Sequence, residues 1–154
     1  GVDVTMELFK VAATHQIPVY CLGAAPGVAQ RAIGNVSAQV GALNIAGIHD
    51  GFFDSAEEQE IIKSIAESKA KLVFVALGVP KQEQWIAEKL SHLDGVVAIG
   101  IGGSFDVLAG NIPRAPEWMQ QNRLEWLYRL YLEPQRIGRM LAIPKFMWTV
   151  IRNK

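Results

Sequence analysis

The feature that most constrains the fold is an alternation of short apolar runs with stretches of helical periodicity. Apolar runs of strand length occupy residues 17–22, 43–48, 71–77 and 96–101, and helical spacing of apolar residues separates them. The run at 71–77 (KLVFVAL) is apolar on both faces, which is typical of a central strand in a parallel sheet. The pattern predicts an α/β fold, a Rossmann-like parallel sheet flanked by helices.

Two helix starts can be predicted from local residues. Asp54 or Ser55 is expected to cap a helix that runs through Ser68, with the acidic Glu57 and Glu58 in its first turn. Pro26 is expected in the first turn of a helix that runs to about Val40.

Composition narrows the class of protein further. Half of the 154 residues are apolar and 19% are charged, which is a globular composition. Cys21 is the single cysteine, so an internal disulfide is excluded, and its apolar surroundings predict a buried, unreactive thiol. Residues 1–16 lack the features of a signal peptide, and no apolar stretch approaches the roughly 18 residues of a membrane-spanning helix.

Charge divides the chain into two predicted domains. Residues 1–111 carry 7 basic and 12 acidic side chains, whereas residues 112–154 carry 8 basic and 3 acidic ones. The second segment is also rich in Trp, Tyr and Phe and is divided by prolines into short helical stretches. A basic segment after an acidic domain predicts an anionic partner; the alternative is a basic face that docks on the acidic domain itself.

Unusual loops follow three of the predicted strands, namely Gly23–Gly27, Gly78–Glu83 and Gly102–Asp106. Ligands of an open parallel sheet bind beyond the carboxyl ends of its strands, so we expect these loops to line one crevice. In the first loop, Gly23, Ala24 and Gly27 permit close backbone approach to a phosphate at the start of the next helix. The alternative is a plain β-to-α turn. The loop lacks the dinucleotide fingerprint G-x-G-x-x-G and the P-loop motif.

The loop after the third strand places polar residues at the start of a helix. Gly78 and Pro80 form the turn, Lys81 can meet a phosphate, and Gln82 can hydrogen-bond sugar hydroxyls or a base edge. Glu83 also has a plain interpretation, because a carboxylate in the first turn of a helix favours the helix dipole.

The loop after the fourth strand and a histidine complete the candidate site. Gly102 and Gly103 allow the backbone to bend over a ligand, and Asp106 can bind a ribose or pair with the basic segment. Ser104 is a further ligand candidate that can instead cap the next helix. His49 is the last candidate, and its alternative role is that of a turn residue.

Five motifs in one order carry a family resemblance across nearly the whole chain. They are LGAAPGVAQ, GIHDGFF, ALGVPKQEQW, IGIGGSFDVLAGNIPRAPEWMQ and LEWLYRLYLEPQRIGRML. The chain thereby resembles the WecG/TagA/CpsF glycosyltransferases. The resemblance implies inverting transfer of an N-acetylmannosamine-type sugar from a UDP-sugar to undecaprenyl-diphosphate-linked N-acetylglucosamine. That reaction serves teichoic acid, common antigen or exopolysaccharide biosynthesis, and the enzyme works peripherally on the cytoplasmic face of the cell membrane.

The resemblance also implies roles for particular residues. Gln82, Arg129, Arg136 and Arg139 become the catalytic candidates, and the three arginines are expected to close over the site and neutralise the leaving diphosphate. The family's T-P-N and P-D-G motifs, the second of which supplies the proposed base, are missing here. We therefore expect the catalytic Asp to lie upstream of Gly1.

The expected ligands and partners follow from the same resemblance. They are the UDP-sugar, the polyprenyl-linked acceptor and an anionic membrane surface, with no metal, cofactor or nucleic acid and with homo-oligomerisation as a possibility. The sequence has no D-x-D motif and no His/Cys cluster with metal-ligand spacing. Two alternatives remain: a nucleotide-binding, oxidoreductase-like α/β domain without transferase activity, and a non-catalytic membrane-associated module.

Overall fold

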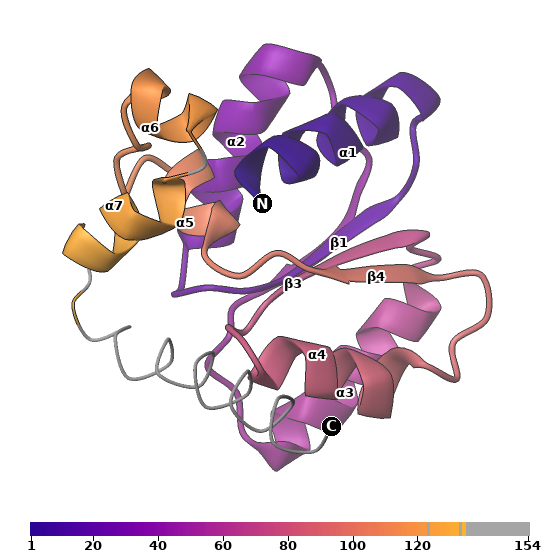
Figure 1. Cartoon of the computed structure of the whole chain (residues 1–154). Coiled ribbons are helices and arrows are strands. Elements are labelled where there is room, and N and C mark those ends of the chain that lie inside the picture. Colours follow the sequence, from indigo (N-terminus) through magenta and orange to yellow (C-terminus); the bar gives the residue numbers. More distant parts are fainter. Residues whose placement is uncertain (123, 133, 135–154) are drawn as a thin grey trace, which may run out of the picture. The chain divides into compact units, whose positions relative to one another are not determined.

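The computed structural model describes residues 1–122, 124–132 and 134, and the chain divides into two compact units, Gly1–Ile112 and Pro113–Lys154. The first unit contains a four-stranded sheet in the order β2-β1-β3-β4, and every neighbouring pair of strands is parallel (Figure 1). The strands are β1 (Val19–Gly23), β2 (Ile45–His49), β3 (Leu72–Ala76) and β4 (Val97–Gly100). The predicted parallel α/β architecture is therefore confirmed.

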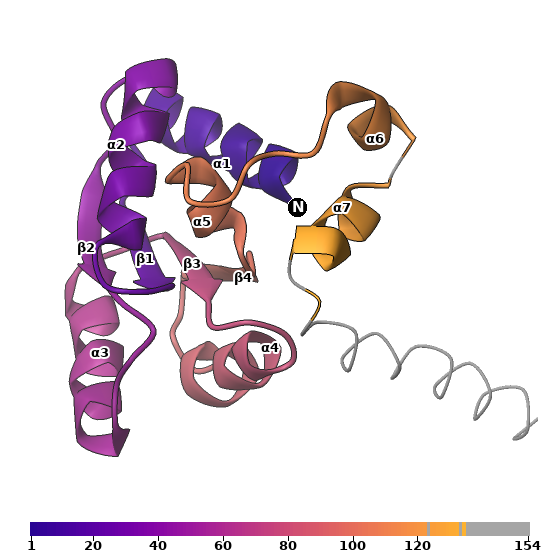
Figure 2. The ribbon, with the colours of Figure 1, turned by 90° about the vertical axis from the view of Figure 1, so that its left-hand side faces the viewer.

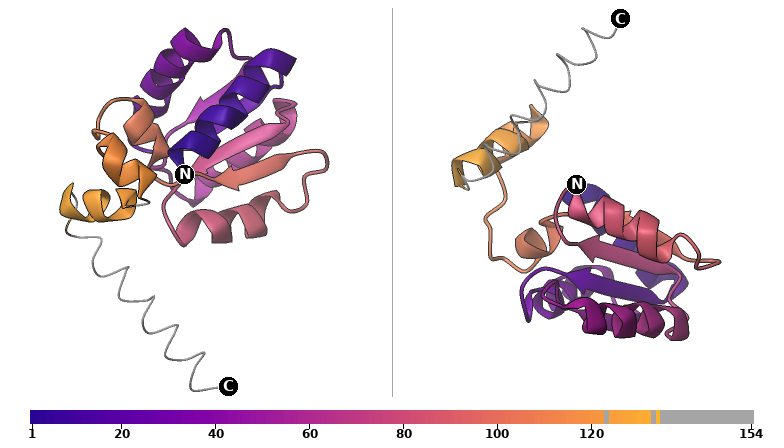
Figure 3. Two further views of the ribbon diagram at one scale, coloured as in Figure 1. Left: turned by 45° about the horizontal axis from the view of Figure 1, so that its top comes forward. Right: turned by 90° about the horizontal axis from the view of Figure 1, so that it is seen from below.

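Helices cover both faces of this sheet (Figure 1; Figure 3). One face packs against α1 (Val2–His15), α2 (Val28–Val40) and α5 (Ser104–Leu108). The other face packs against α3 (Ser55–Glu67), α4 (Lys81–Trp85) and the π-helical turn η1 (Ile86–Leu90) that continues α4. The sheet therefore lies between two helical layers, and the loops at the carboxyl ends of its strands can carry a site.

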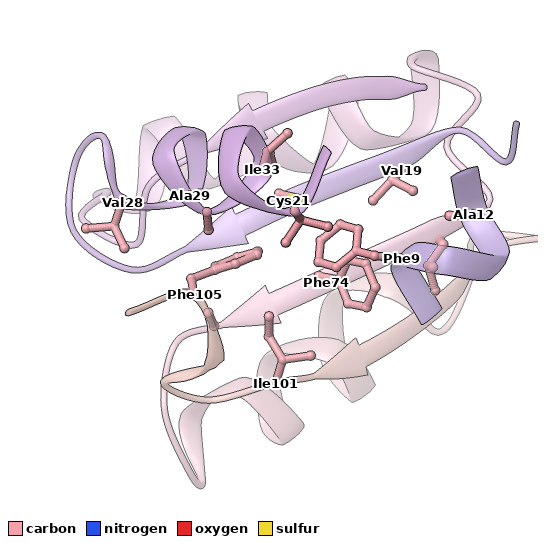
Figure 4. Packing of buried hydrophobic residues seen from close by; sticks show 14 residues of the cluster. Phe9, Ala12, Val19, Cys21, Val28, Ala29, Ile33, Phe74, Ile101 and Phe105 are labelled. Atoms are coloured by element: carbon pink, nitrogen blue, oxygen red, sulfur yellow. The ribbon is translucent and has the colours of Figure 1, made fainter. Parts of the chain in front are cut away.

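Alternating side chains of the central strands build the two apolar cores. Val19 and Cys21 of β1 join Phe74 of β3 in one core, where the Phe9 ring of α1 packs at a tilt against the Phe74 ring with centroids 4.5 Å apart (Figure 4). Leu22 and the other intervening residues of β1 and β3 enter the opposite core. All five residues of β3 are buried, which confirms the prediction that this strand is central. In β1, burial raises the pKa of the Cys21 thiol, as expected for an unreactive cysteine.

The two helix starts that the sequence predicted differ in outcome. Asp54 caps α3 as expected: its carboxylate accepts from the backbone N–H groups of Ala56 and Glu57, and the Glu57 carboxylate accepts from the Asp54 N–H. Pro26, expected in the first turn of the next helix, lies instead in the turn before α2. The reason is that Gly27 adopts φ 78°, a left-handed conformation that delays the helix until Val28.

The second unit contains α6 (Glu117–Gln121) and α7 (Glu125–Leu132). The two helices are linked by a hydrogen bond, in which the N–H of Leu124, just before α7, donates to the Met119 carbonyl of α6 at 2.7 Å. Trp118 and Tyr131 are exposed on these helices. None of the helices in the described part of the chain is long and apolar enough to cross a membrane.

A half-buried ion pair and a hydrogen bond hold α4 and η1 against α3. The Glu58 carboxylate of α3 accepts from the Trp85 indole N–H at 2.8 Å and from the Lys89 ammonium at 3.0 Å. The Lys89 ammonium, and to a smaller extent the Trp85 hydrogen bond, hold the pKa of Glu58 below its usual value of 4.5 against an opposing effect of desolvation. This link fixes the helix that begins at Lys81, and therefore the loop that precedes it.

The lowered Glu58 pKa predicts a pH-dependent contribution to stability. Because the folded state holds this carboxyl ionised, the link stabilises the fold above the usual pKa of 4.5 and is lost as the pH falls through the lowered value. The Glu58→Gln variant should therefore be less stable than the parent at pH 7, and the difference should shrink below about pH 4. Urea unfolding at several pH values measures it. The exposed Glu60→Gln variant is the control, and an equal pH dependence for both variants would contradict the assignment.

Candidate functional site

The strand order creates a natural binding position at the carboxyl edge of the sheet. The chain passes from β1 outward to β2, returns across β1 to β3, and continues in the opposite direction to β4. The order thus reverses between β1 and β3, which is where ligands of open α/β sheets bind. Figure 2 views this edge, where the predicted loops Gly23–Gly27, Gly78–Glu83 and Gly102–Asp106 follow β1, β3 and β4.

Backbone hydrogen bonds bring the loop after β1 against its neighbours. The Ala24 N–H donates to the Ala76 carbonyl at 3.0 Å, and the Gly51 N–H donates to the Ala24 carbonyl at 2.8 Å. Gly23 adopts φ 119°, and a Cβ atom on it would lie 2.4 Å from the Ala76 carbonyl oxygen. Close packing against β3 therefore requires glycine at position 23, in keeping with the alternative interpretation of this loop as a tight β-to-α turn.

The far end of this loop has the features of an anion site. Gly27 is the N-cap of α2, and no side chain caps the first N–H groups of this helix. The Arg31 guanidinium lies beside the loop, because its Nη1 atom is 3.4 Å from where a Cβ on Gly27 would stand. Arg31 also donates to the Asn111 side-chain oxygen at 3.1 Å, and Asn111 donates to Asp106 at 3.4 Å. Arg31 is not among the residues predicted from the sequence, because its spacing does not show that its side chain turns back toward Gly27.

The loops after β3 and β4 meet through Gln82. The chain turns at Gly78, which has φ 80°, and α4 starts after Pro80, which follows a cis peptide bond. The Gly78 carbonyl accepts from the Gln82 backbone N–H at 2.8 Å, while the Gln82 side-chain oxygen accepts from the Gly102 N–H at 3.0 Å. The Gln82 side chain is 3% exposed, so its amide is directed into the protein, although the sequence favoured a ligand contact for it.

Ser104 shows a similar turn away from the surface. Its hydroxyl donates to the Ile101 carbonyl at 2.6 Å, and the residue is 1% exposed. Gly103, not Ser104, occupies the N-cap position of α5. In this structure Ser104 therefore holds the turn after β4, and the parts of the loop left nearer the surface are Gly102, Gly103 and the half-buried Asp106.

Aromatic and basic side chains gather after β2. The Lys81 ammonium, on an exposed side chain, lies 5.5 Å from the centre of the Phe53 ring, and His49 meets the same ring edge-on at 6.0 Å. Phe52 is 70% exposed, which is unusual for an aromatic side chain, and its ring can stack on a planar ligand. The sequence identified Lys81 and His49 but not Phe52. Phe52 and Phe53 are adjacent, and the sequence does not show which of the two rings is exposed.

His49 also borders a cavity away from the three loops. The cavity has a volume of about 590 Å³ and lies between β2 and α3, with Tyr20, Ile48, Glu57, Glu60 and Ile61 among its lining. The His49 Nδ1 atom is 3.0 Å from the Asp50 carbonyl oxygen. His49 thus contacts the Phe53 ring and also lines this cavity. It lies at the end of β2, the edge strand on the opposite side of β1 from β3 and β4.

The predicted arginines belong to the second unit. Arg129 lies in α7, but its side chain is outside the described part of the structure. Arg136 and Arg139 fall outside the described residues altogether. Among the residues that the structure does describe, no group of three or more His, Cys, Asp or Glu side chains is arranged to hold a metal ion.

Comparisons with known proteins agree on one family. The model of the glycosyl transferase WecG/TagA/CpsF family matches residues 1–154. A Bacillus subtilis (strain 168) protein named N-acetylglucosaminyldiphosphoundecaprenol N-acetyl-beta-D-mannosaminyltransferase is 40% identical over the whole chain, and proteins of the same name from Bacillus spizizenii and Staphylococcus aureus (strain NCTC 8325) are 40% and 33% identical. The chain covers 59–60% of the length of these relatives.

The close approach of Gly23 to Ala76 predicts that alanine destabilises the protein at Gly23 but not at Gly34. Gly23→Ala should lower the free energy of unfolding by about 1–3 kcal/mol, because Cβ meets backbone and the positive φ strains any other residue. Gly34→Ala, in the middle of α2 with open space around it, should be neutral or stabilising by up to about 1 kcal/mol. Chemical denaturation measures both. Equal effects at the two glycines would show that the loop does not pack on β3 as described.

Proposed function

We propose that this chain, which belongs to the WecG/TagA/CpsF family of glycosyl transferases, is part of an enzyme that transfers an N-acetylmannosamine-type sugar from a UDP-sugar. The proposed acceptor is an undecaprenyl-diphosphate-linked N-acetylglucosamine. The observation that carries this proposal is the match of the whole chain to relatives whose name states N-acetyl-beta-D-mannosaminyl transfer to N-acetylglucosaminyldiphosphoundecaprenol. Since the chain spans about three fifths of those relatives, the activity is proposed for the whole protein, and residues 1–154 alone are expected to bind nucleotide without turnover.

The geometry at the carboxyl edge of the sheet supports a donor site there. In this proposal the diphosphate of the donor lies against the loop Gly23–Gly27 and the N-terminus of α2, close to the guanidinium of Arg31. Lys81 adds a second positive charge from the start of α4, with its side chain exposed. The nucleoside then extends toward Phe52 and Asp106, which offer an aromatic face and a carboxylate acceptor for ribose hydroxyls.

The proposed reaction is a direct displacement with inversion at the anomeric carbon. The acceptor hydroxyl oxygen attacks that carbon, the bond from the carbon to the UDP oxygen breaks, and the proton of the hydroxyl passes to a base. The base is expected from the part of the protein upstream of Gly1. UDP leaves with additional negative charge, and we assign its stabilisation to Arg129, Arg136 and Arg139.

The proposed lipid acceptor accounts for the basic, aromatic segment that follows the α/β unit in the sequence. Residues 112–154 have 8 basic against 3 acidic side chains, and Trp118 and Tyr131 are exposed in the described part of that segment. Anionic lipid attracts each Lys or Arg near its surface by about 1 kcal/mol, and aromatic side chains favour the membrane interface. We therefore propose peripheral binding to the inner face of the cell membrane, with the product entering bacterial cell-surface polysaccharide.

Enzyme assays of the full-length protein test this function. With a UDP-linked N-acetylmannosamine and a soluble analogue of the lipid acceptor, the protein should release UDP and form a disaccharide product. Replacing Arg129, Arg136 and Arg139 by alanine should lower turnover on this soluble acceptor by at least about tenfold, because the leaving diphosphate loses its counter-charges. Replacing Lys145, Arg152 and Lys154 should instead weaken only the binding to anionic liposomes.

Two results would contradict the proposal. Binding of UDP without any transfer by the full-length protein would favour the alternative of a nucleotide-binding domain. Truncation after Gln121 that leaves both turnover and liposome binding intact would remove the proposed role of the basic segment.

A further inference from the structure

Gln82 is a polar side chain whose hydrogen-bonding capacity is used inside the protein. It is 3% exposed, and both ends of its amide are paired. The side-chain oxygen accepts from the Gly102 N–H at 3.0 Å, and the side-chain nitrogen donates to the Glu83 carboxylate at 2.7 Å. The two partners fix the orientation of the amide, because an N–H group needs the oxygen and a carboxylate needs the nitrogen.

The position of this amide depends on a second residue, Gly100 at the end of β4. A Cβ atom on Gly100 would lie 2.5 Å from the Gln82 side-chain nitrogen and 2.8 Å from its Cδ atom. Gly100 does not have a positive φ, so the backbone there would accept alanine. What alanine would displace is the flexible end of Gln82, and the strand itself would remain in place.

The loop after β4 is held at its two ends. The Ile101 N–H donates to the Val75 carbonyl at 2.9 Å where the loop begins, and Phe105, where it enters α5, is fully buried. Between these ends, Gly102 has φ 54°, a left-handed conformation that glycine adopts readily, and Gly103 follows it. Ser104 fixes one side of the turn by donating to the Ile101 carbonyl. Gln82 fixes the other side, and it does so from α4, an element that starts directly after the loop of β3.

We propose that Gln82 is a positioning residue that sets the loop Gly102–Asp106 relative to the loop Gly78–Glu83, and that it acts on the donor through Gly102 without touching the donor itself. The proposal rests on the proposed function in one respect, namely that these loops border the donor. It differs from the expectation drawn from sequence, in which the Gln82 amide contacts the sugar or the base directly.

A double-mutant cycle on the full-length protein separates the two roles. The variants are Gln82→Ala, Gly100→Ala and the combination of both. Each single change should lower kcat/KM for the donor by about tenfold and speed hydrogen exchange of the Gly102 amide, measured by NMR without substrate. Gly100→Ala should have little further effect in the Gln82→Ala background, because its Cβ then has no amide to displace.

A paired exchange of side chains provides a rescue. In Gln82→Glu combined with Glu83→Gln, the carboxylate at 82 can accept from the Gly102 N–H while the amide at 83 donates to it. Slow exchange of the Gly102 amide should return in this double variant. Gln82→Glu alone, which sets two carboxylates against each other, should not restore it.

Matched controls exclude a general loss of structure. Gln84→Ala changes an exposed glutamine two residues along the same helix, and Gly34→Ala changes a glycine with open space around it; neither should alter exchange or kinetics. Unchanged exchange of Gly102 in Gln82→Ala, or a tenfold effect of Gly100→Ala that persists without Gln82, would overturn the proposal. If exchange responds as expected but the parent protein transfers no sugar, the positioning role stands and the proposed function fails.

Discussion

The parallel pairing of β1 with β3 is the constraint on which the rest of the structure depends. These two strands are buried on both faces and stand side by side at the centre of the sheet, in register from Val19 opposite Leu72 to Gly23 opposite Ala76. Their apolar side chains anchor both helical layers, and their parallel direction brings both carboxyl ends to one edge. The loop after β1 reaches this edge only because Gly23 lets the backbone pass against Ala76. Core packing and the candidate site are therefore set by the same pair of strands.

Much of the fold could be predicted because local sequence patterns determine the strands and one of the helix starts. Apolar runs located all four strands to within two residues, and the residues Asp54 and Glu57 identified the capped start of α3. Helix starts that depend on backbone conformation were harder to locate, as the left-handed Gly27 shows. Parallel topology then placed the three unusual loops at one edge, which follows from strand direction without any knowledge of side chains.

The details of the candidate site were less accessible, since they depend on contacts between residues far apart in sequence. The position of Gln82 in the sequence does not show that its amide turns inward to meet Gly102. Nor does the sequence show that Gly100 leaves space for this amide. The chain from Arg31 to Asp106 through Asn111 joins residues that only the tertiary fold brings together. The family resemblance supplied the catalytic candidates, and the fold supplied the contacts of the one candidate whose side chain is described, Gln82.

The central claim is that the donor nucleotide binds at the carboxyl edge of the sheet, where the strand order reverses between β1 and β3. A crystal structure of the full-length protein with UDP tests it most directly. The account predicts the diphosphate against the loop Gly23–Gly27, within reach of Arg31, with the nucleoside between Phe52 and the loop after β4. UDP bound at the opposite edge of the sheet, or in the cavity between β2 and α3 without contact to these loops, would contradict it.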